Sequence, residues 1–165
     1  GIEKGFMTTV HAYTADQNLQ DAPHSDLRRS RAAAYSIIPT STGAAKAVGL
    51  VLPHLKGKLD GNAMRVPTPD VSMVDLNVVV KKQTTKEEVT AVFNEIANTR
   101  LKGLLLMDKE MRVSQDFVGS THTSNFDAGA GIALNDHFFK LIAWYDNEYG
   151  YSAKLIELAT HVASL

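Results

Sequence analysis

The amino-acid sequence predicts an α+β fold, with a mixed, mainly antiparallel sheet and helices covering one face. Strand-like and helix-like segments are interleaved without the strict alternation of a doubly wound parallel sheet. Short turns, such as residues 67–70, join several predicted strands directly. The chain has 165 residues, of which 44% are apolar, and this is enough for one well-buried core. We therefore expect a single domain spanning residues 1–165.

The first predicted strand covers residues 5–11 and ends at a histidine, His11. Residues 16–31 follow as a polar stretch without periodicity, which predicts a long ordered loop. We expect this loop to end in a short helix at residues 27–34. Long loops in compact domains commonly bind ligands or partners, so this one is a candidate binding element.

The next predicted elements are a helix at residues 42–52 and a strand at residues 71–82. Thr42 or Ser41 can cap the first turn of the helix, and Pro53 ends it. The strand is predicted by its clean alternation of apolar and polar residues, which is typical of a strand buried on one face. The apolar members of this alternation are Val74, Leu76, Val78 and Val80.

The last third of the chain predicts a helix, a strand and a closing helix. Apolar residues recur at helical spacing over residues 86–99, and Thr85 with Glu88 forms a capping box at the start. An apolar strand is expected at residues 138–145. The closing helix is expected to pack through one apolar face, made of Tyr151, Leu155, Leu158, Ala159 and Val162.

Composition excludes several classes of function. The 17 basic and 18 acidic residues give a formal charge of −1, so the chain has no field that would gather nucleic acid or an anionic membrane. No apolar run is long enough to span a membrane, and no signal-peptide pattern is present, so a cytoplasmic location is expected. Cysteine is absent, which excludes disulfides, thiolate metal sites and a cysteine nucleophile within this chain. No metal site is expected.

The leading catalytic candidate is His11. It lies at a predicted strand end, followed at once by Tyr13, Thr14 and Asp16. Histidine changes charge near neutral pH, so it can exchange protons with a substrate whose polar groups are held by neighbouring hydroxyls. A structural histidine is the alternative interpretation of this segment alone.

Two further stretches predict anion binding. The run Thr40, Ser41, Thr42 and Gly43 offers hydroxyl donors at the start of a predicted helix, where unpaired N–H groups favour an anion, although the same residues make an ordinary cap. Arg65 stands inside an apolar stretch, where its guanidinium needs a cleft or a fixed partner. An ion pair with Asp70 or Asp75 is the structural alternative, and a phosphate is the functional one.

Four motifs together resemble the catalytic domain of glyceraldehyde-3-phosphate dehydrogenase, and the resemblance runs from Gly1 to Leu165. The motifs are HAYTADQ, DLRRSRAAAYSIIPTSTGAAKAVG, GKLDGNAMRVPTPDVSMVDL and WYDNEYGYS. In that family a cysteine attacks the aldehyde of glyceraldehyde 3-phosphate, a histidine activates the cysteine, and NAD takes the hydride. Inorganic phosphate then releases 1,3-bisphosphoglycerate from the thioester.

The resemblance implies a role for each matching residue. His11 matches the catalytic histidine. Thr14, Asp16 and Arg65 match the site for the substrate's phosphate, whereas Thr42, Gly43 and Arg29 match the site for inorganic phosphate, with Arg31 as the alternative arginine. Asn147 matches the residue that holds the nicotinamide carboxamide of NAD, and Tyr151 lies near the same ring. Residues 16–38 resemble the S-loop, which reaches toward a neighbouring subunit of the homotetramer.

The chain also departs from the family pattern. The nucleophilic cysteine and the N-terminal dinucleotide-binding domain have no counterpart here, so we expect a fragment that is inactive alone. No G-x-G-x-x-G fingerprint follows a predicted strand, so the chain should not bind a dinucleotide by itself. Two other interpretations stay open: a domain of erythrose-4-phosphate dehydrogenase, and a noncatalytic binding or oligomerisation module.

Overall fold

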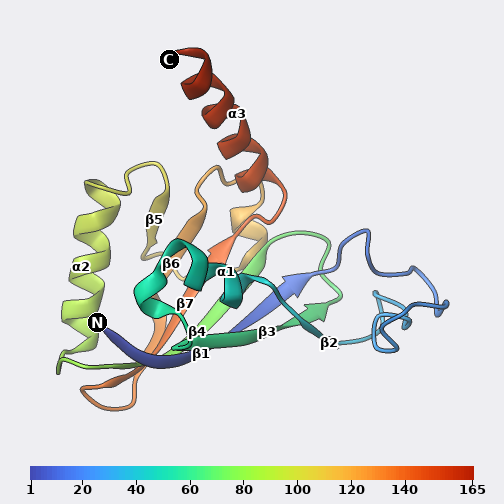
Figure 1. Ribbon diagram of the computed structural model, residues 1–165, viewed down its shortest axis with the longest axis horizontal. Helices are drawn as coiled ribbons and strands as arrows, with labels where there is room; N and C mark the ends of the chain where they lie inside the picture. Colours follow the sequence, from blue (N-terminus) through green and yellow to red (C-terminus); the bar gives the residue numbers. More distant parts are fainter.

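The computed structural model describes all 165 residues, apart from the side chains of Ala45 and Lys46. One seven-stranded mixed sheet runs through the molecule in the order β2-β3-β1-β4-β7-β6-β5 (Figure 1). Four of its six strand pairs are antiparallel, and β1 with β3 and β5 with β6 are parallel. The predicted α+β class with a mainly antiparallel sheet is confirmed. The strands are β1 (Ile2–Ala12), β2 (Ile38–Ser41), β3 (Leu59–Val66), β4 (Ser72–Val80), β5 (Leu105–Asp108), β6 (Ser124–Ala133) and β7 (Phe138–Tyr145).

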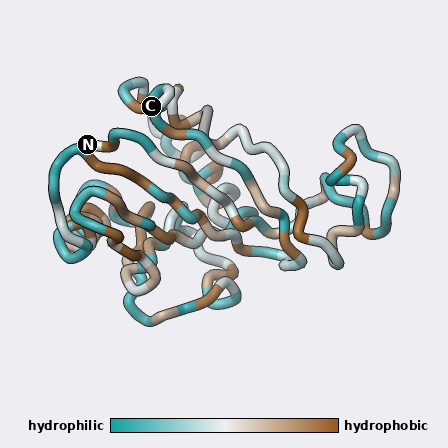
Figure 2. The backbone as a smooth tube through the Cα atoms, turned by 90° about the horizontal axis from the view of Figure 1, so that it is seen from below, coloured by the Kyte–Doolittle hydropathy of each residue, from teal (hydrophilic) through white to brown (hydrophobic). Residues whose placement is uncertain are grey.

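The centre of the sheet follows the alternation seen in the sequence. β4 lies between β1 and β7 and pairs antiparallel with both. Its Val78 is 2% exposed and lies opposite Phe139 of β7, which is 1% exposed. Figure 2 shows hydrophobic backbone segments running through the strands and hydrophilic segments in the large loop at one end. The core is therefore built on the middle strands, and the loop lies outside it.

Two helices pack against the sheet. α1 (Ala44–Val51) contacts β3, and α2 (Lys86–Asn98) contacts β5 and β6. The Phe93 ring of α2 stacks on Phe126 of β6 with the two centroids 4.1 Å apart. The side-chain cap predicted for α1 is not present at its N-cap position, which is Gly43. The Thr42 hydroxyl instead accepts the N–H of Ala44 at 3.2 Å.

The capping box predicted at the start of α2 is confirmed. The Thr85 hydroxyl accepts the Glu88 N–H at 3.2 Å, and the Glu88 carboxylate accepts the Thr85 N–H at 3.1 Å. Replacing Thr85 with alanine is expected to lower the free energy of unfolding by about 1 kcal/mol, because the Glu88 N–H at the helix start loses its acceptor. Urea unfolding measures this loss. Thr85→Ser, which keeps the hydroxyl, is the control, and an equal loss in both variants would contradict the explanation.

The last helix, α3 (Tyr149–Ala163), corrects one sequence prediction. It projects from the end of β7 away from the sheet (Figure 1), and its only buried residue is Gly150. Its predicted packing face is open: Tyr151 is 72% exposed and Leu158 57%. The prediction was wrong because helical periodicity identifies an apolar face but not the surface that covers it.

No helix among the described residues is long and apolar enough to cross a membrane.

The segment between β1 and β2 forms a long loop, as predicted, but without the short helix expected at residues 27–34. Residues 27–30 and 33–35 form turns instead. A single turn forms at residues 27–30, where Asp26 accepts the N–H of Arg28 at 2.9 Å through its side chain and the N–H of Ser30 at 3.2 Å through its carbonyl. The turn does not extend into a helix, because the N–H of Ala32, which a helix would pair with the Arg28 carbonyl, donates to the Asp21 side chain at 2.8 Å.

Candidate active site

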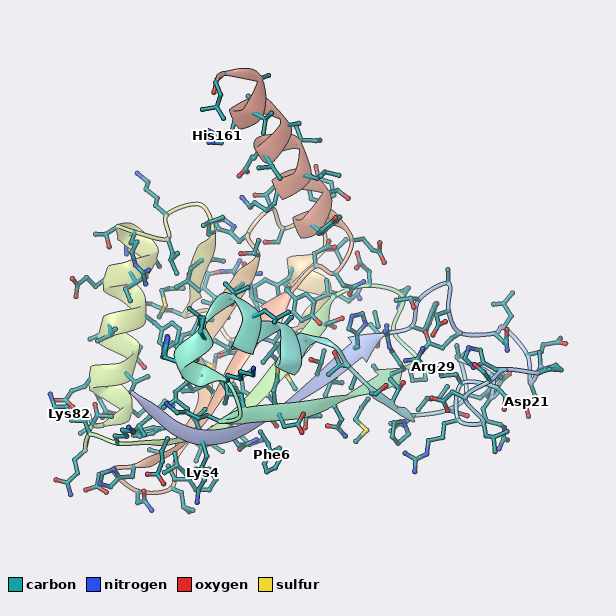
Figure 3. The ribbon with its side chains drawn as sticks, in the orientation of Figure 1. Lys4, Phe6, Asp21, Arg29, Lys82 and His161 are labelled. Carbon is teal, nitrogen blue, oxygen red and sulfur yellow. The ribbon has the colours of Figure 1, made fainter. Side chains whose placement is uncertain are left out.

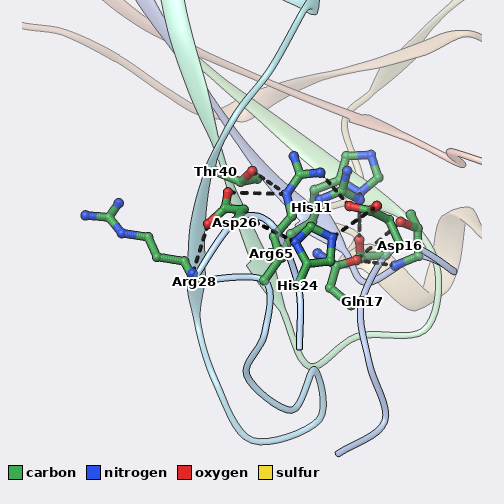
Figure 4. Close-up of polar contacts among 11 residues, drawn as sticks. His11, Asp16, Gln17, His24, Asp26, Arg28, Thr40 and Arg65 are labelled. Atoms are coloured by element: carbon green, nitrogen blue, oxygen red, sulfur yellow. Dashed lines mark hydrogen bonds and ion pairs between the residues drawn. The ribbon is translucent and has the colours of Figure 1, made fainter. Parts of the chain in front are cut away.

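His11 lies near the C-terminal end of β1, where the chain leaves the sheet and enters the large loop (Figure 4). β1 and β3 run parallel, and their register places His11 directly beside Arg65. Two residues separated by 54 positions in sequence therefore occupy neighbouring places on two adjacent strands. The structure thus brings together these two predicted site residues.

The imidazole of His11 has two close polar neighbours at the same ring nitrogen. Nδ1 lies 2.7 Å from the Ala12 carbonyl oxygen and 2.8 Å from Nη1 of Arg65. The ring also packs edge-on against Tyr145, with centroids 6.0 Å apart. Burial is the main cause that lowers the pKa of His11; the Ala12 carbonyl and Glu148 oppose this shift, and the charge of Arg65 adds to it.

Arg65 is held by the backbone of the neighbouring strand. Its Nη1 donates to the Ala12 carbonyl at 3.0 Å. Its Nε is buried and has no hydrogen-bond partner among the described residues. Burial and then the charge of Arg29 lower the pKa of Arg65, whereas Tyr145 and Asp16 oppose this, and the guanidinium stays charged at neutral pH. Neither Asp70 nor Asp75 forms the ion pair with Arg65 that the sequence allowed, because Asp70 accepts the N–H of Val71 and Asp75 pairs with Lys140.

Ser72 connects the histidine end of β1 to Asn147. Its hydroxyl accepts the Ala12 N–H at 3.2 Å and donates to Oδ1 of Asn147 at 2.7 Å. Burial raises the pKa of Tyr145, and the neighbouring side chains of Ser72 and Thr9 partly oppose this shift. Sequence reasoning missed both Ser72 and Tyr145. Both residues lie at strand ends, next to residues that the sequence analysis had selected, and this position could have identified them.

The large loop contributes a second cluster, which reaches the sheet through Arg29. Nε of Arg29 donates to the Thr40 hydroxyl of β2 at 2.8 Å, and its Nη1 pairs with Asp16. Asp16 also lies 3.7 Å from His24. Figure 3 shows Arg29 near the sheet, whereas Asp21 lies at the outer part of the loop. The negative charge of Asp16 would by itself repel a phosphate. We therefore interpret its role in this cluster as holding Arg29 in place.

Thr14 is fixed by Gln17, which sequence reasoning also missed. Oε1 of Gln17 accepts the Thr14 N–H at 2.8 Å and the Thr14 hydroxyl at 3.2 Å. The Gln17 N–H returns to the Thr14 carbonyl at 2.9 Å. The side-chain amide nitrogen of Gln17 is buried without a partner among the described residues. Thr14 is thus held in a closed turn next to His11.

Three candidate residues and the alternative arginine lie outside these contacts. Thr42 and Gly43 immediately precede α1, and the Thr42 hydroxyl accepts the backbone N–H of Ala44. Arg31 is 63% exposed in its side chain and pairs with Asp21, so Arg29 is the arginine that points to the sheet. Tyr151 is exposed on α3. In the part of the chain that the structure describes, no three histidine, aspartate or glutamate side chains form a metal-binding group.

Comparison with known proteins identifies the family to which the chain is similar. Residues 1–147 match the family described as "Glyceraldehyde 3-phosphate dehydrogenase, C-terminal domain". The chain is 56% identical over 164 residues to glyceraldehyde-3-phosphate dehydrogenase of Geobacillus stearothermophilus, covering 99% of this chain and 49% of that protein. It is 57% identical over 161 residues to the Borreliella burgdorferi enzyme, covering 96% and 48%. It is 56% identical over 164 residues to glyceraldehyde-3-phosphate dehydrogenase 3 of Saccharomyces cerevisiae, covering 99% and 49%.

These relatives define both the family and the extent of the match. The chain spans about half the length of the curated relatives it matches. The matched half corresponds to a single family unit, the C-terminal domain, and the resemblance drawn from the four motifs is confirmed. The chain belongs to the glyceraldehyde-3-phosphate dehydrogenase family, through its C-terminal domain.

Proposed function

We propose that the full-length protein is an NAD-dependent, phosphorylating glyceraldehyde-3-phosphate dehydrogenase, and that residues 1–165 form its single catalytic domain. It converts glyceraldehyde 3-phosphate, inorganic phosphate and NAD to 1,3-bisphosphoglycerate and NADH, and it works in the cytoplasm. The observation that carries this proposal is the contact between His11 and Arg65, which combines a base with an anion-binding cation at the C-terminal ends of two adjacent strands. Family membership supplies the reaction class.

His11 acts as the general base. When Nδ1 donates its hydrogen to the Ala12 carbonyl, the lone pair of Nε2 is free to accept a proton from a thiol. The sequence contains no cysteine, so that nucleophile comes from outside this chain, and the chain alone is expected to show no turnover.

Two groups of residues hold the two anions. Arg65 and Thr14 bind the phosphate of glyceraldehyde 3-phosphate, and the unpartnered Nε of Arg65 supplies a buried donor for it. Asp16 belongs to the same group and links it to Arg29 of the second group through their ion pair. Thr42, Gly43 and Arg29 bind inorganic phosphate, supported by the bond that ties Arg29 to Thr40, two residues before Thr42.

Asn147 and Tyr151 contribute to NAD binding. The Asn147 amide nitrogen carries two hydrogens and donates one of them to Glu148, so the second can bind the carboxamide oxygen of the nicotinamide. Ser72 fixes the orientation of the amide through its bond to Oδ1. When bound, NAD accepts a hydride, which is the chemistry that no side chain of this chain can supply.

Replacing Arg65 with glutamine is expected to raise KM for glyceraldehyde 3-phosphate by about tenfold or more, because charge-assisted hydrogen bonds to the phosphate are lost. Steady-state kinetics of the full-length protein measure the effect. Arg31→Gln is the matched control: it removes the same charge from an exposed arginine paired with Asp21, and KM should stay unchanged. Equal KM values for the two variants would contradict the assignment of Arg65.

Aldehyde preference and assembly are tested separately. The relatives described above are named for glyceraldehyde 3-phosphate, and clearly better turnover of erythrose 4-phosphate would instead favour the sister enzyme.

The protein acts as a homotetramer in which residues 16–38 reach a neighbouring subunit. Support comes from open apolar surface: Phe6 is 69% exposed and lines a depression of about 470 Å³ with Leu59, Val79 and Phe138. Sedimentation that shows only monomers at micromolar concentration would contradict the assembly.

A further inference from the structure

The contact between Arg65 and His11 joins two groups that can both carry positive charge. Nη1 of Arg65 lies 2.8 Å from Nδ1 of His11, close enough for a hydrogen bond. Arginine can only donate in this contact, so it requires a lone pair at Nδ1, whereas the 2.7 Å contact of the same atom with the Ala12 carbonyl requires an N–H there. Arg65 and the Ala12 carbonyl therefore compete for Nδ1: the arginine favours a neutral ring with its hydrogen at Nε2, and the carbonyl favours a ring that carries a hydrogen at Nδ1.

Protonation of His11 would change this contact. A doubly protonated imidazole has an N–H at Nδ1 and a positive charge. That N–H can donate to the Ala12 carbonyl at 2.7 Å, but it faces an N–H of Arg65 at 2.8 Å. Two cations at this separation repel each other strongly in a half-buried site. His11 can take up a proton at low cost only when Nη1 of Arg65 moves away or its charge is compensated.

The charge of Arg65 is uncompensated by the groups around it. Among the described residues, no carboxylate lies within ion-pair distance of its guanidinium; the nearby Asp16 pairs with Arg29 and His24 instead. The other charged or titratable groups that face His11 and Arg65 are Tyr145, Glu148 and Arg29. Tyr145 is neutral at physiological pH because burial raises its pKa. The remaining donor of Arg65, the buried Nε, has no partner among the described residues.

We propose that Arg65 couples anion binding to the protonation of His11, so that a phosphate group bound by Arg65 makes the imidazole a stronger base. This inference rests on the proposed phosphate site and adds a regulatory role to it. An oxyanion that accepts hydrogen bonds from the guanidinium compensates its charge and draws Nη1 away from Nδ1. Nδ1 is then free to carry a hydrogen toward the Ala12 carbonyl, and Nε2 accepts a proton more readily.

The consequence for the enzyme is an ordered activation. Without substrate, burial and the uncompensated charge of Arg65 together hold the pKa of His11 below its usual value. With the substrate's phosphate in place, the same imidazole becomes able to accept the thiol proton. Linkage also requires the reciprocal effect: the protonated form of His11 must bind the anion more tightly than the neutral form, and couplings of this kind are typically about fivefold or more.

Sulfate is the probe that tests this coupling, because it stays a dianion from about pH 5 to about pH 9, the range in which histidine titrates. The full-length protein is labelled at the histidine Cε1–H groups, and each histidine is titrated by NMR with and without sulfate at constant ionic strength. The midpoint of His11 is expected to rise when sulfate is present. Sulfate affinity is expected to fall by about fivefold or more as the pH rises through that midpoint.

Two comparisons separate the coupling from a general effect of salt. His137 should keep the same midpoint with and without sulfate. Its Nδ1 contacts the carbonyl of Val80 at 2.8 Å, and Val80 lies at the opposite end of β4 from Ser72. In Arg65→Gln, the sulfate-dependent rise at His11 should disappear, and the midpoint without sulfate should be higher than in the unchanged protein. Arg31→Gln should behave like the unchanged protein.

The outcomes distinguish this inference from the proposed function. If sulfate shifts the Nε–H signal of Arg65 but leaves the midpoint of His11 unchanged, the coupling is overturned and the phosphate site stands. If sulfate leaves both the Arg65 signal and the His11 midpoint unchanged up to high concentration, the proposed phosphate site fails, and the coupling fails with it. Because the comparison with and without sulfate is made on the unchanged protein, it remains decisive even if Arg65→Gln does not fold.

Discussion

Replacing His11 with asparagine is expected to lower kcat of the full-length enzyme by about 10² to 10⁴-fold, the usual contribution of a general base. Asparagine places an amide N–H near the position of Nδ1, so it can still donate to the Ala12 carbonyl and preserve the strand end. What it removes is Nε2, the only group at this position that can accept the proton. The loss should therefore appear in kcat and leave binding of the substrate's phosphate nearly unchanged.

The matched control for this prediction is His137→Asn. Its Nδ1 also lies against a backbone carbonyl, that of Val80, but it stands at the start of β7, away from Arg65. The same chemical change there should leave kcat unaltered. A His11→Asn enzyme with kcat near that of the unchanged protein would refute the role assigned to His11.

Replacing Phe139 with alanine is expected to cost about 3 to 5 kcal/mol of unfolding free energy, the range typical of large-to-small changes in a close-packed core. Phe139 lies in β7 opposite Val78 of β4 and is 1% exposed, so its removal leaves a cavity between central strands. Urea denaturation at fixed protein concentration measures the change, with the slope m used to verify that the folded state remains compact.

Leu134→Ala is the control for the core variant. It also truncates a large apolar side chain to alanine, but Leu134 is 74% exposed in the turn between β6 and β7. Its cost should lie within about 0.5 kcal/mol of zero, as is usual for surface positions. If both variants lost similar stability, burial in β7 would not be the source of the effect.

The sequence predicted the central architecture because its periodicities are strong. Alternation predicted β4, and the capping box with helical spacing predicted α2. The position of His11 at the end of β1 followed from the apolar run before it. In these segments, local preference and tertiary packing favour the same structure, and sequence reasoning works best under that condition.

Other features could not be predicted, for identifiable physical reasons. The expected helix at residues 27–34 is absent because Asp21 takes the backbone N–H of Ala32, a competition that composition alone does not reveal. The contact of Arg65 with His11 depends on the parallel register of two strands that are distant in sequence. The roles of Ser72 and Gln17 depend on hydrogen bonds that the fold creates. Spacing in the sequence gives no measure of such distances.

The parallel pairing of β1 with β3 also has a kinetic consequence. A whole crossover, including β2 and α1, separates the two strands, so their pairing must close a long stretch of chain before any contact compensates the lost entropy. A slip of one residue in this pairing would turn Arg65 to the opposite face of the sheet. During refolding, α2 should therefore regain its structure early, whereas the histidine and arginine should meet only in the last, slowest phase.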